Sequence, residues 1–243
     1  MASYPQFNQN DYRNNYQPYS PAGTGVATMP SVMRRVYLNM TLGLIVTAIV
    51  SLFCASQGFV YYMYTHSWVM WALIIAEFGL VIGINGAINK ISAGIATLLF
   101  FLFSAVNGLM LSSIFVVYTG GALARTFFIT AGTFGAMSLY GYFTNRDLSK
   151  MGGILTMCLF GLIIAMLVNL FLKSSTMDWI VSILGVLIFV GLTAWDTQRI
   201  RQIAAVTPAE MTGKVAALGA LTLYLDFINL FLFLLRFFGG NRD

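Results

Sequence analysis

Seven long apolar stretches, separated by short polar ones, follow one another from about residue 36 to the C-terminus of the chain. Each is close to the ~20 mostly apolar residues that a helix needs to cross the hydrocarbon of a membrane. Within each stretch the apolar residues are continuous rather than alternating, which predicts helices and excludes the strands of a membrane barrel. We therefore expect an all-α integral membrane protein with seven transmembrane helices, at residues 36–59, 68–88, 92–118, 122–143, 153–172, 179–197 and 215–238.

The composition is typical of a membrane protein. Of the 243 residues, 58% are hydrophobic and 9% are charged, whereas a soluble domain has about a quarter of its residues charged. The net charge of +5 comes from basic residues scattered at the ends of apolar stretches, so no nucleic-acid partner is expected. Cys54 and Cys158 lie in separate apolar stretches without a CxxC motif, so we expect neither a disulfide framework nor a zinc site, and no resident cofactor.

Residues 1–30 differ from the rest of the chain. They are rich in Asn, Gln, Tyr and Pro and have no apolar period. Such a segment cannot bury enough apolar surface to fold, so we expect a disordered tail at 1–30 and one membrane domain at 31–243. The tail lacks the basic and short apolar regions of a cleaved signal peptide, which predicts that the first span stays as an anchor.

The basic residues predict the orientation in the membrane. If the N-terminus is cytoplasmic, nine of them fall on the cytoplasmic side and four on the other, which agrees with the positive-inside rule. With seven spans, the C-terminus is then exported. The cytoplasmic group is Arg13, Arg34, Arg35, Lys90, Arg146, Lys150, Arg199, Arg201 and Lys214, and the opposite group is Arg125, Lys173, Arg236 and Arg242.

Small residues four apart predict where membrane helices approach closely. We interpret two such faces as packing seams, with Asn169 as the one member that could point into a cavity. They are Ser104, Gly108 and Ser112 in the third stretch, and Gly161, Ala165 and Asn169 in the fifth.

Three of the eight acidic residues, Glu77, Asp196 and Asp226, lie inside apolar stretches. A carboxylate in hydrocarbon is costly, so an acidic residue within a span faces protein or water and is a candidate for function. Asp196 shares a helix face with Thr193. Asp226 belongs to a polar stripe at steps of three and four residues, formed by Thr222, Asp226, Asn229, Phe233 and Arg236.

Asp196 and Asp226 lie on antiparallel helices that are neighbours in sequence, which we expect to be joined by a loop of about fifteen residues. Both can reach the same core, and a shared proton lowers the cost of burying two carboxylates. We predict that they pair, titrate as a unit and act as a pH sensor. The alternative is that either one bonds a buried cation or hydroxyl and only fixes helix register. For Glu77 no partner is evident.

Two aspartates on late helices also suggest intramembrane proteolysis, in which a carboxylate pair activates water. Enzymes of that type carry GxGD before the second aspartate, whereas this chain has "TLYLD". No serine–histidine arrangement, HExxH motif or phosphate-binding glycine loop replaces it. We expect that the protein is not an enzyme.

Three segments carry a resemblance to a known family: "TAGTFGAMSLYGYFTNRDLSKMG", "WDTQRI" and "LGALTLYLDFINLFLFLLRFFG". In these the chain resembles the Bax inhibitor-1 (transmembrane BAX inhibitor motif) family, and most of all its bacterial inner-membrane branch. The resemblance runs from about residue 31 to the C-terminus. It implies a multi-pass protein of the inner membrane, with a bundle of seven helices in which the last is central and surrounded by the other six.

The resemblance also implies a pH-responsive calcium leak, with calcium as the transported ion. The paired aspartates of the family match Asp196 in "WDTQ" and Asp226 in "LDFIN", which would also contact calcium, and Glu77 matches an acidic position of the second helix. One departure is that relatives can have an arginine late in the second helix that pairs with the first aspartate. This chain reads "INGAINK" there, and Lys90 is the nearest cation.

Three functions compete. A cation leak would use the carboxylates of Glu77, Asp196 and Asp226 to replace part of the oxygen shell of calcium, with Asn229, Thr193, Arg236 and Lys90 in support. A non-transporting regulator would bind a membrane protease or another membrane complex, as some bacterial relatives do, and would depend on residues 1–30. A proton-coupled solute transporter would show internal repeats and interrupted helices, and no clear repeat is present.

Overall fold

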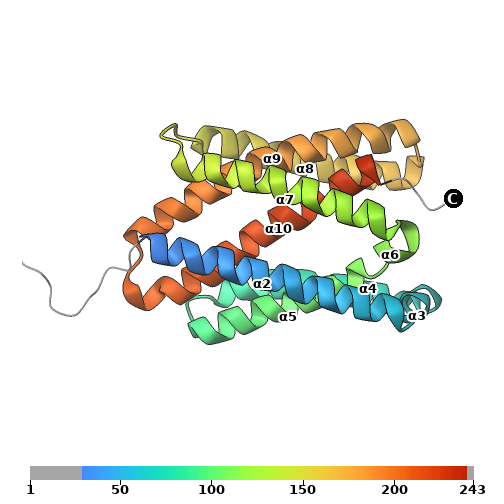
Figure 1. Ribbon diagram of the computed structural model, residues 1–243, viewed down its shortest axis with the longest axis horizontal. Helices are drawn as coiled ribbons and strands as arrows, with labels where there is room; N and C mark the ends of the chain where they lie inside the picture. Colours follow the sequence, from blue (N-terminus) through green and yellow to red (C-terminus); the bar gives the residue numbers. More distant parts are fainter. Residues whose placement is uncertain (1–28, 240–243) are drawn as a thin grey trace, which may run out of the picture.

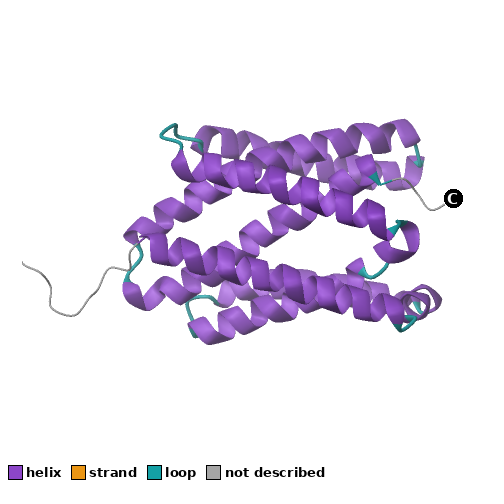
Figure 2. Ribbon diagram, viewed as in Figure 1, coloured by secondary structure: helices purple, strands orange, loops and turns teal. Residues whose placement is uncertain are grey.

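The computed structural model describes residues 29–239, and within this range the chain is almost entirely helical (Figures 1 and 2). The expected tail lies outside the described residues, apart from Met29 and Pro30, which begin the first helix instead of ending the tail. A proline is well tolerated in a first helical turn, because its missing N–H would have no partner there. The helices are α2 (Met29–Ser56), α3 (Phe59–Thr65), α4 (Ser67–Ala87), α5 (Ala93–Leu111), α6 (Ile114–Val117), α7 (Gly120–Phe143), α8 (Ser149–Leu172), α9 (Ser175–Val206), the 3-10 helix η1 (Ala209–Met211) and α10 (Thr212–Phe238).

Six helical segments of the described chain are long and apolar enough to cross a membrane. They are α2, α4, α5 with α6, α8, α9, and η1 with α10. The seventh long helix, α7, has 24 residues but a more polar sequence, "GGALARTFFITAGTFGAMSLYGYF". The all-helical membrane fold is therefore established, and the seventh span stays a prediction.

Besides the earlier start of α2, the helices differ from the expected stretches in three places by more than a few residues. The third stretch breaks after α5, where the hydroxyl groups of Ser112 and Ser113 donate to the carbonyls of Leu109 and Met110 and so compete with the helix backbone. A short helix, α3, lies where a loop was expected.

The third difference concerns α9, which continues nine residues beyond the predicted end at 197, to Val206. It ends where Thr207 precedes Pro208, because a proline disfavours the helical conformation of the residue before it. Arg199 and Arg201 therefore belong to the helix, and the connection to α10 is much shorter than the fifteen residues expected.

The helices form two groups with α10 between them, as Figure 1 shows. One group contains α2, α4 and α5, and the other contains α7, α8 and α9. The main contacts of α10 are with α2, α5, α7 and α9, whereas α4 packs mainly on α5 and α8 on α9. The apolar segment that ends in α10 is 72% buried, compared with 11% for α4 and for α8. Helix α10 is therefore the most enclosed of the six apolar segments. That it contacts all the other long helices stays a prediction.

Close approach at small residues holds each group together. A Cβ atom on Gly141 of α7 would lie 2.1 Å from the carbonyl oxygen of Ala194, and one on Gly152 of α8 would lie 2.1 Å from the ring of Trp195. Both helices therefore pack directly on α9, because they carry glycine there. The predicted seam of α5 also exists, since a Cβ atom on Gly108 would lie 2.8 Å from the backbone of α2 at Thr47.

The second predicted seam is wrong at Gly161, whereas Ala165 packs against the core and Asn169 lines a cavity, as was suggested for it. A Cβ atom on Gly161 would meet nothing within 4 Å, and this residue faces outward on α8. Asn169, from the same predicted face, is buried and holds the turn between α8 and α9. Gly161 was placed wrongly because a small-residue spacing does not reveal which face of a helix meets a neighbour.

Candidate functional site

The bundle has two ends, which we name by the chain. The N-terminal end contains the start of α2 and the connections α4–α5, α7–α8 and α9–α10 (Figure 1). The C-terminal end contains the connections α2–α4, α5–α7 and α8–α9 and the last turn of α10. The predicted site residues are distributed between these two ends and the interior.

Asp196 of α9 and Asp226 of α10 lie together in the interior. Their side chains are within hydrogen-bonding range of each other, and they are only 7% and 5% exposed. Two carboxyl groups form a hydrogen bond only when one of them carries a proton. The buried Oδ2 atom of Asp226 has no hydrogen-bond partner within residues 29–239, so a proton on the pair is needed to satisfy its oxygen atoms.

A cation and a cavity adjoin this pair. The guanidinium of Arg199, one helical turn after Asp196, interacts with its carboxylate and lies 5.4 Å from the ring centre of Trp195. A cavity of about 190 Å³ is lined by Asp196, Arg199 and Asn85 together with residues of the first turns of α10. The pair is thus reached from the N-terminal end of the bundle.

The two expected supporting residues next to the pair bond to their own helices. The hydroxyl of Thr193 donates to the Phe189 carbonyl at 2.7 Å, and the amide of Asn229 donates to the Leu225 carbonyl at 2.8 Å. Thr193 is fully buried and Asn229 half-buried. Neither has a hydrogen bond to an aspartate within the described chain.

Glu77 is half-buried and belongs to a separate network that the sequence did not reveal. Its Oε1 atom accepts a hydrogen bond from the amide of Asn107 at 2.9 Å, and the Oδ1 atom of Asn107 accepts one from the Tyr224 hydroxyl at 3.1 Å. The Tyr224 hydroxyl lies 2.6 Å from the hydroxyl of Thr47, which also donates to the Ser104 carbonyl at 2.8 Å. This network joins α4, α5, α10 and α2.

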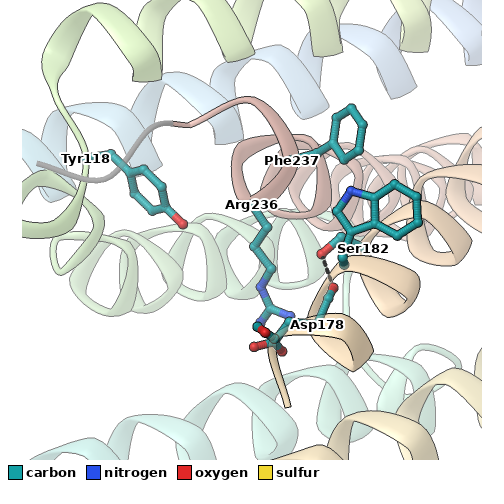
Figure 3. A pocket seen from close by; sticks show the side chains of 7 residues that line it. Tyr118, Asp178, Ser182, Arg236 and Phe237 are labelled. Atoms are coloured by element: carbon teal, nitrogen blue, oxygen red, sulfur yellow. Dashed lines mark hydrogen bonds between the residues drawn. The ribbon is translucent and has the colours of Figure 1, made fainter. Parts of the chain in front are cut away.

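Arg236 and Lys90 lie far from the aspartate pair. Arg236 is in the last turn of α10, ten residues after Asp226, which corresponds to about 15 Å along a helix. Its guanidinium lies 5.8 Å from the ring centre of Phe233 and faces a pocket that it shares with Asp178 (Figure 3). Lys90 is exposed in the α4–α5 connection and is not among the residues lining the Asp196 cavity. In the described chain the cation beside Asp196 is therefore Arg199.

A second feature missed by the sequence reasoning is Gln198, which holds the α7–α8 connection. Its Oε1 atom accepts from the Leu148 N–H at 2.9 Å, and its Nε2 atom donates to the Arg146 carbonyl at 2.8 Å. Arg201, one turn later, donates to the Tyr142 carbonyl. The segments "TNRDLSK" and "WDTQRIR" are thus bound together, and their polar composition at helix ends was the available signal.

Within the same connection, Asp147 accepts hydrogen bonds from Ser149, which lower the pKa of its exposed carboxyl below the usual range. One of these bonds comes from the Ser149 backbone N–H at 2.9 Å. It satisfies a free N–H group in the first turn of α8, where a negative charge also complements the helix dipole. Asp147 therefore fixes the start of α8.

The described residues contain no group of three or more His, Cys, Asp and Glu side chains that could hold a metal ion. A bound calcium ion takes six to eight oxygen ligands, and two carboxyl groups supply fewer.

Comparisons with known proteins identify the family. Residues 29–243 match the family model described as "Inhibitor of apoptosis-promoting Bax1". The chain is 50% identical over 220 residues to the inner membrane protein YbhL of Escherichia coli (strain K12), covering 89% of this chain and 94% of that protein. It is 47% identical over 214 residues to an uncharacterized protein of Borreliella burgdorferi, covering 87% of this chain and 92% of that protein.

A more distant relative covers nearly the whole length. The chain is 33% identical over 231 residues to an uncharacterized membrane protein of Streptococcus pyogenes serotype M6, covering 94% of this chain and 99% of that protein. Together with the six apolar helices, the E. coli relative supports a multi-pass location in the inner membrane. The chain belongs to the Bax inhibitor-1 family of membrane proteins.

Proposed function

We propose that this protein is a pH-sensitive calcium leak of the membrane, gated by the protonation of the Asp196–Asp226 pair. The observation that carries the proposal is the position of the pair, at the contact between α9 and α10. Protein interiors are close-packed, so a change at this contact must be accommodated by the helices around it. Because α10 is the most enclosed of the six apolar segments, a change here reaches α2, α5 and α7.

The chemistry of the pair explains how protons would act. With one shared proton, a carboxyl donates to a carboxylate and holds α9 against α10. Without it, two negative charges would face each other in a medium of low dielectric, which is unfavourable by several kcal/mol. The number of protons on the pair therefore sets the free energy of the α9–α10 contact.

The proposed ion path uses oxygen atoms on the described helices. Asp196 faces the cavity at the N-terminal end, where the amide of Asn85 and the hydroxyl of Thr222 supply further oxygen atoms. Glu77 offers a carboxylate on the other side of α10, held by Asn107. Hard cations such as calcium require oxygen ligands of these kinds, and protons compete for the carboxylates.

The proposed topology has seven spans, with α10 in the centre and the other six, α7 among them, around it. An odd number of spans puts the two termini on opposite sides of the membrane. In agreement, the described chain begins at one end of the bundle and finishes at the other (Figure 1). The N-terminal end of the bundle contains the basic residues Lys90, Arg146, Lys150 and Lys214. We place this end in the cytoplasm, because basic residues are enriched on the cytoplasmic side of membrane proteins.

The alternative function is a regulator that binds a membrane protease or another membrane complex through residues 1–30. Deletion of these residues separates the two proposals. Calcium flux into vesicles that contain the purified protein should be unchanged by the deletion, because the proposed path lies within residues 29–239. If vesicles with the full chain show no flux above empty vesicles, while the deletion abolishes capture of a membrane protein, the regulator replaces the leak.

A further inference from the structure

Three charged side chains gather at the C-terminal end of the bundle, away from the aspartate pair. Asp178 of α9 and Arg236 of α10 line two adjoining cavities, of about 520 and 560 Å³. Lys173, which follows α8, lines the second cavity as well. Figure 3 shows the Arg236 side chain reaching toward Asp178 across the first cavity. The cavities thus present two positive groups and one negative group.

The turn between α8 and α9 fixes two of these charges. The amide of the buried Asn169 donates to Oδ1 of Asp178 at 2.7 Å, and its own Oδ1 accepts from the Ser174 N–H at 3.0 Å. Lys173 closes the helix in the left-handed conformation, with φ 50°, which is unfavourable for a residue other than glycine or asparagine. From this position Lys173 lines the second cavity.

The wall of the second cavity is apolar and open to the side of the bundle. Ile163, Leu167 and Leu170 of α8 line it and are 44%, 56% and 67% exposed. Because α8 is one of the six apolar segments, these side chains face the lipid. Trp179 and Tyr118 line the first cavity, and such aromatic residues are enriched where membrane helices meet the headgroups.

We propose that this groove binds one membrane phospholipid with a phosphoethanolamine headgroup. Arg236 and Lys173 bind the phosphate, Asp178 accepts from the ammonium group, and one acyl chain lies along α8. The choice of this headgroup rests on the charges of Arg236, Lys173 and Asp178. A phosphoethanolamine headgroup has one anionic group with several acceptor atoms and one compact cation with N–H donors, and the cavities offer the complementary set.

Other headgroups fit the three charges less well. A phosphocholine group has no N–H to donate to Asp178, and a phosphoglycerol group has no cation to pair with it. Asp178 retains the capacity to accept further hydrogen bonds beside the one from Asn169, because a carboxylate accepts about four. The arginine remains able to bind phosphate, because a guanidinium has five N–H donors and the 5.8 Å contact of Arg236 with the Phe233 ring is a cation–π contact.

The test is lipid retention by the full chain, purified in detergent and measured by native mass spectrometry. The protein is mixed with equal amounts of phosphatidylethanolamine, phosphatidylglycerol and phosphatidylcholine. We expect the wild type to retain phosphatidylethanolamine preferentially. Arg236→Gln and Lys173→Asn should each reduce this retention roughly fivefold. Asparagine is chosen because it tolerates the left-handed conformation, so that mainly the charge changes.

Matched variants make the test specific. Asp178→Asn keeps an acceptor for Asn169 and should remove the preference over phosphatidylglycerol. Arg236→Lys should keep retention within about twofold, because it keeps the charge although not the bidentate geometry. Lys150→Gln, an exposed lysine at the other end of the bundle, should change nothing and serves as the control.

Three results would overturn the proposal: equal retention of the three lipids by the wild type, equal retention by wild type and charge variants, or displacement of the lipid by millimolar inorganic phosphate. The last would identify a site for free phosphate. The outcome is independent of the calcium leak, because lipid retention is measured without ion flux and at residues distant from the aspartate pair.

Discussion

Tyr224 and Asp226 lie two residues apart on α10 and make their polar contacts on opposite sides of that helix. Tyr224 reaches Thr47 of α2 and Asn107 of α5, whereas Asp226 reaches Asp196 of α9. Residues two positions apart point in directions about 200° apart on a helix with 3.6 residues per turn. Hydrogen bonds therefore hold α10 to both groups of helices, and only one of the two contacts requires a proton on a carboxyl group.

Tyr224→Phe tests the contact that needs no such proton. The substitution keeps the fully buried ring and leaves Oδ1 of Asn107 without its donor. We expect the free energy of unfolding in detergent to fall by about 1 kcal/mol, as for other hydrogen bonds between membrane helices. The control is Tyr140→Phe, because the Tyr140 side chain is exposed. Equal stability of the two variants would show that the network does not hold α10.

Gly141→Ala tests the packing of α7 on α9. Its new Cβ atom would lie 2.1 Å from the carbonyl oxygen of Ala194, and backbone cannot move aside as a side chain does. We expect a loss of about 1–3 kcal/mol in the free energy of unfolding, as for other overpacked sites. In the same helix, Gly135→Ala meets nothing within 4 Å and should be neutral or slightly stabilising. Equal free energies of unfolding for Gly141→Ala and Gly135→Ala would contradict the close packing of α7 on α9 at Gly141.

Gln198→Ala tests the α7–α8 connection. It leaves the buried N–H of Leu148 without a partner, so we expect a loss of about 1–3 kcal/mol in stability. Trypsin should also cleave faster after Arg146, because the connection loses both hydrogen bonds from Gln198. The matched control is Gln202→Ala, one turn later and exposed. Cleavage at the control rate would contradict the role of Gln198.

The positions of the long helices could be predicted from the apolar stretches, because membrane spans must be apolar over their whole length. The ends could not. In α9 the residues "QRIRQIAAV" are too polar to be read as part of a span, yet they favour a helix and continue it to Val206. Hydropathy indicates which residues lie in the membrane, whereas helix propensity and Pro208 determine where α9 ends.

The pairing of Asp196 with Asp226 could be anticipated, because their helices are antiparallel neighbours and each carries one acidic residue in its interior. The partner of Glu77 could not. Asn107 lies 30 residues away on the next helix, and the rotation of α4 against α5 is set by packing that no spacing in the sequence reveals. For Gln198 the polar composition of its segment was the one available signal, because its two partners are backbone groups, which no residue type identifies.

The most direct test of the central claim is calcium flux into liposomes that contain the purified full chain, measured over a range of pH around neutral. Wild type is compared with Asp196→Asn and Asp226→Asn, and Glu210→Gln, an exposed carboxylate outside the long helices, is the control. We predict that wild-type and control flux depend on pH and that each asparagine variant flattens this dependence, because it removes a titrating group from the pair. Flux no higher than that of empty liposomes at any pH, or an unchanged pH dependence in both asparagine variants, would contradict gating by the aspartate pair.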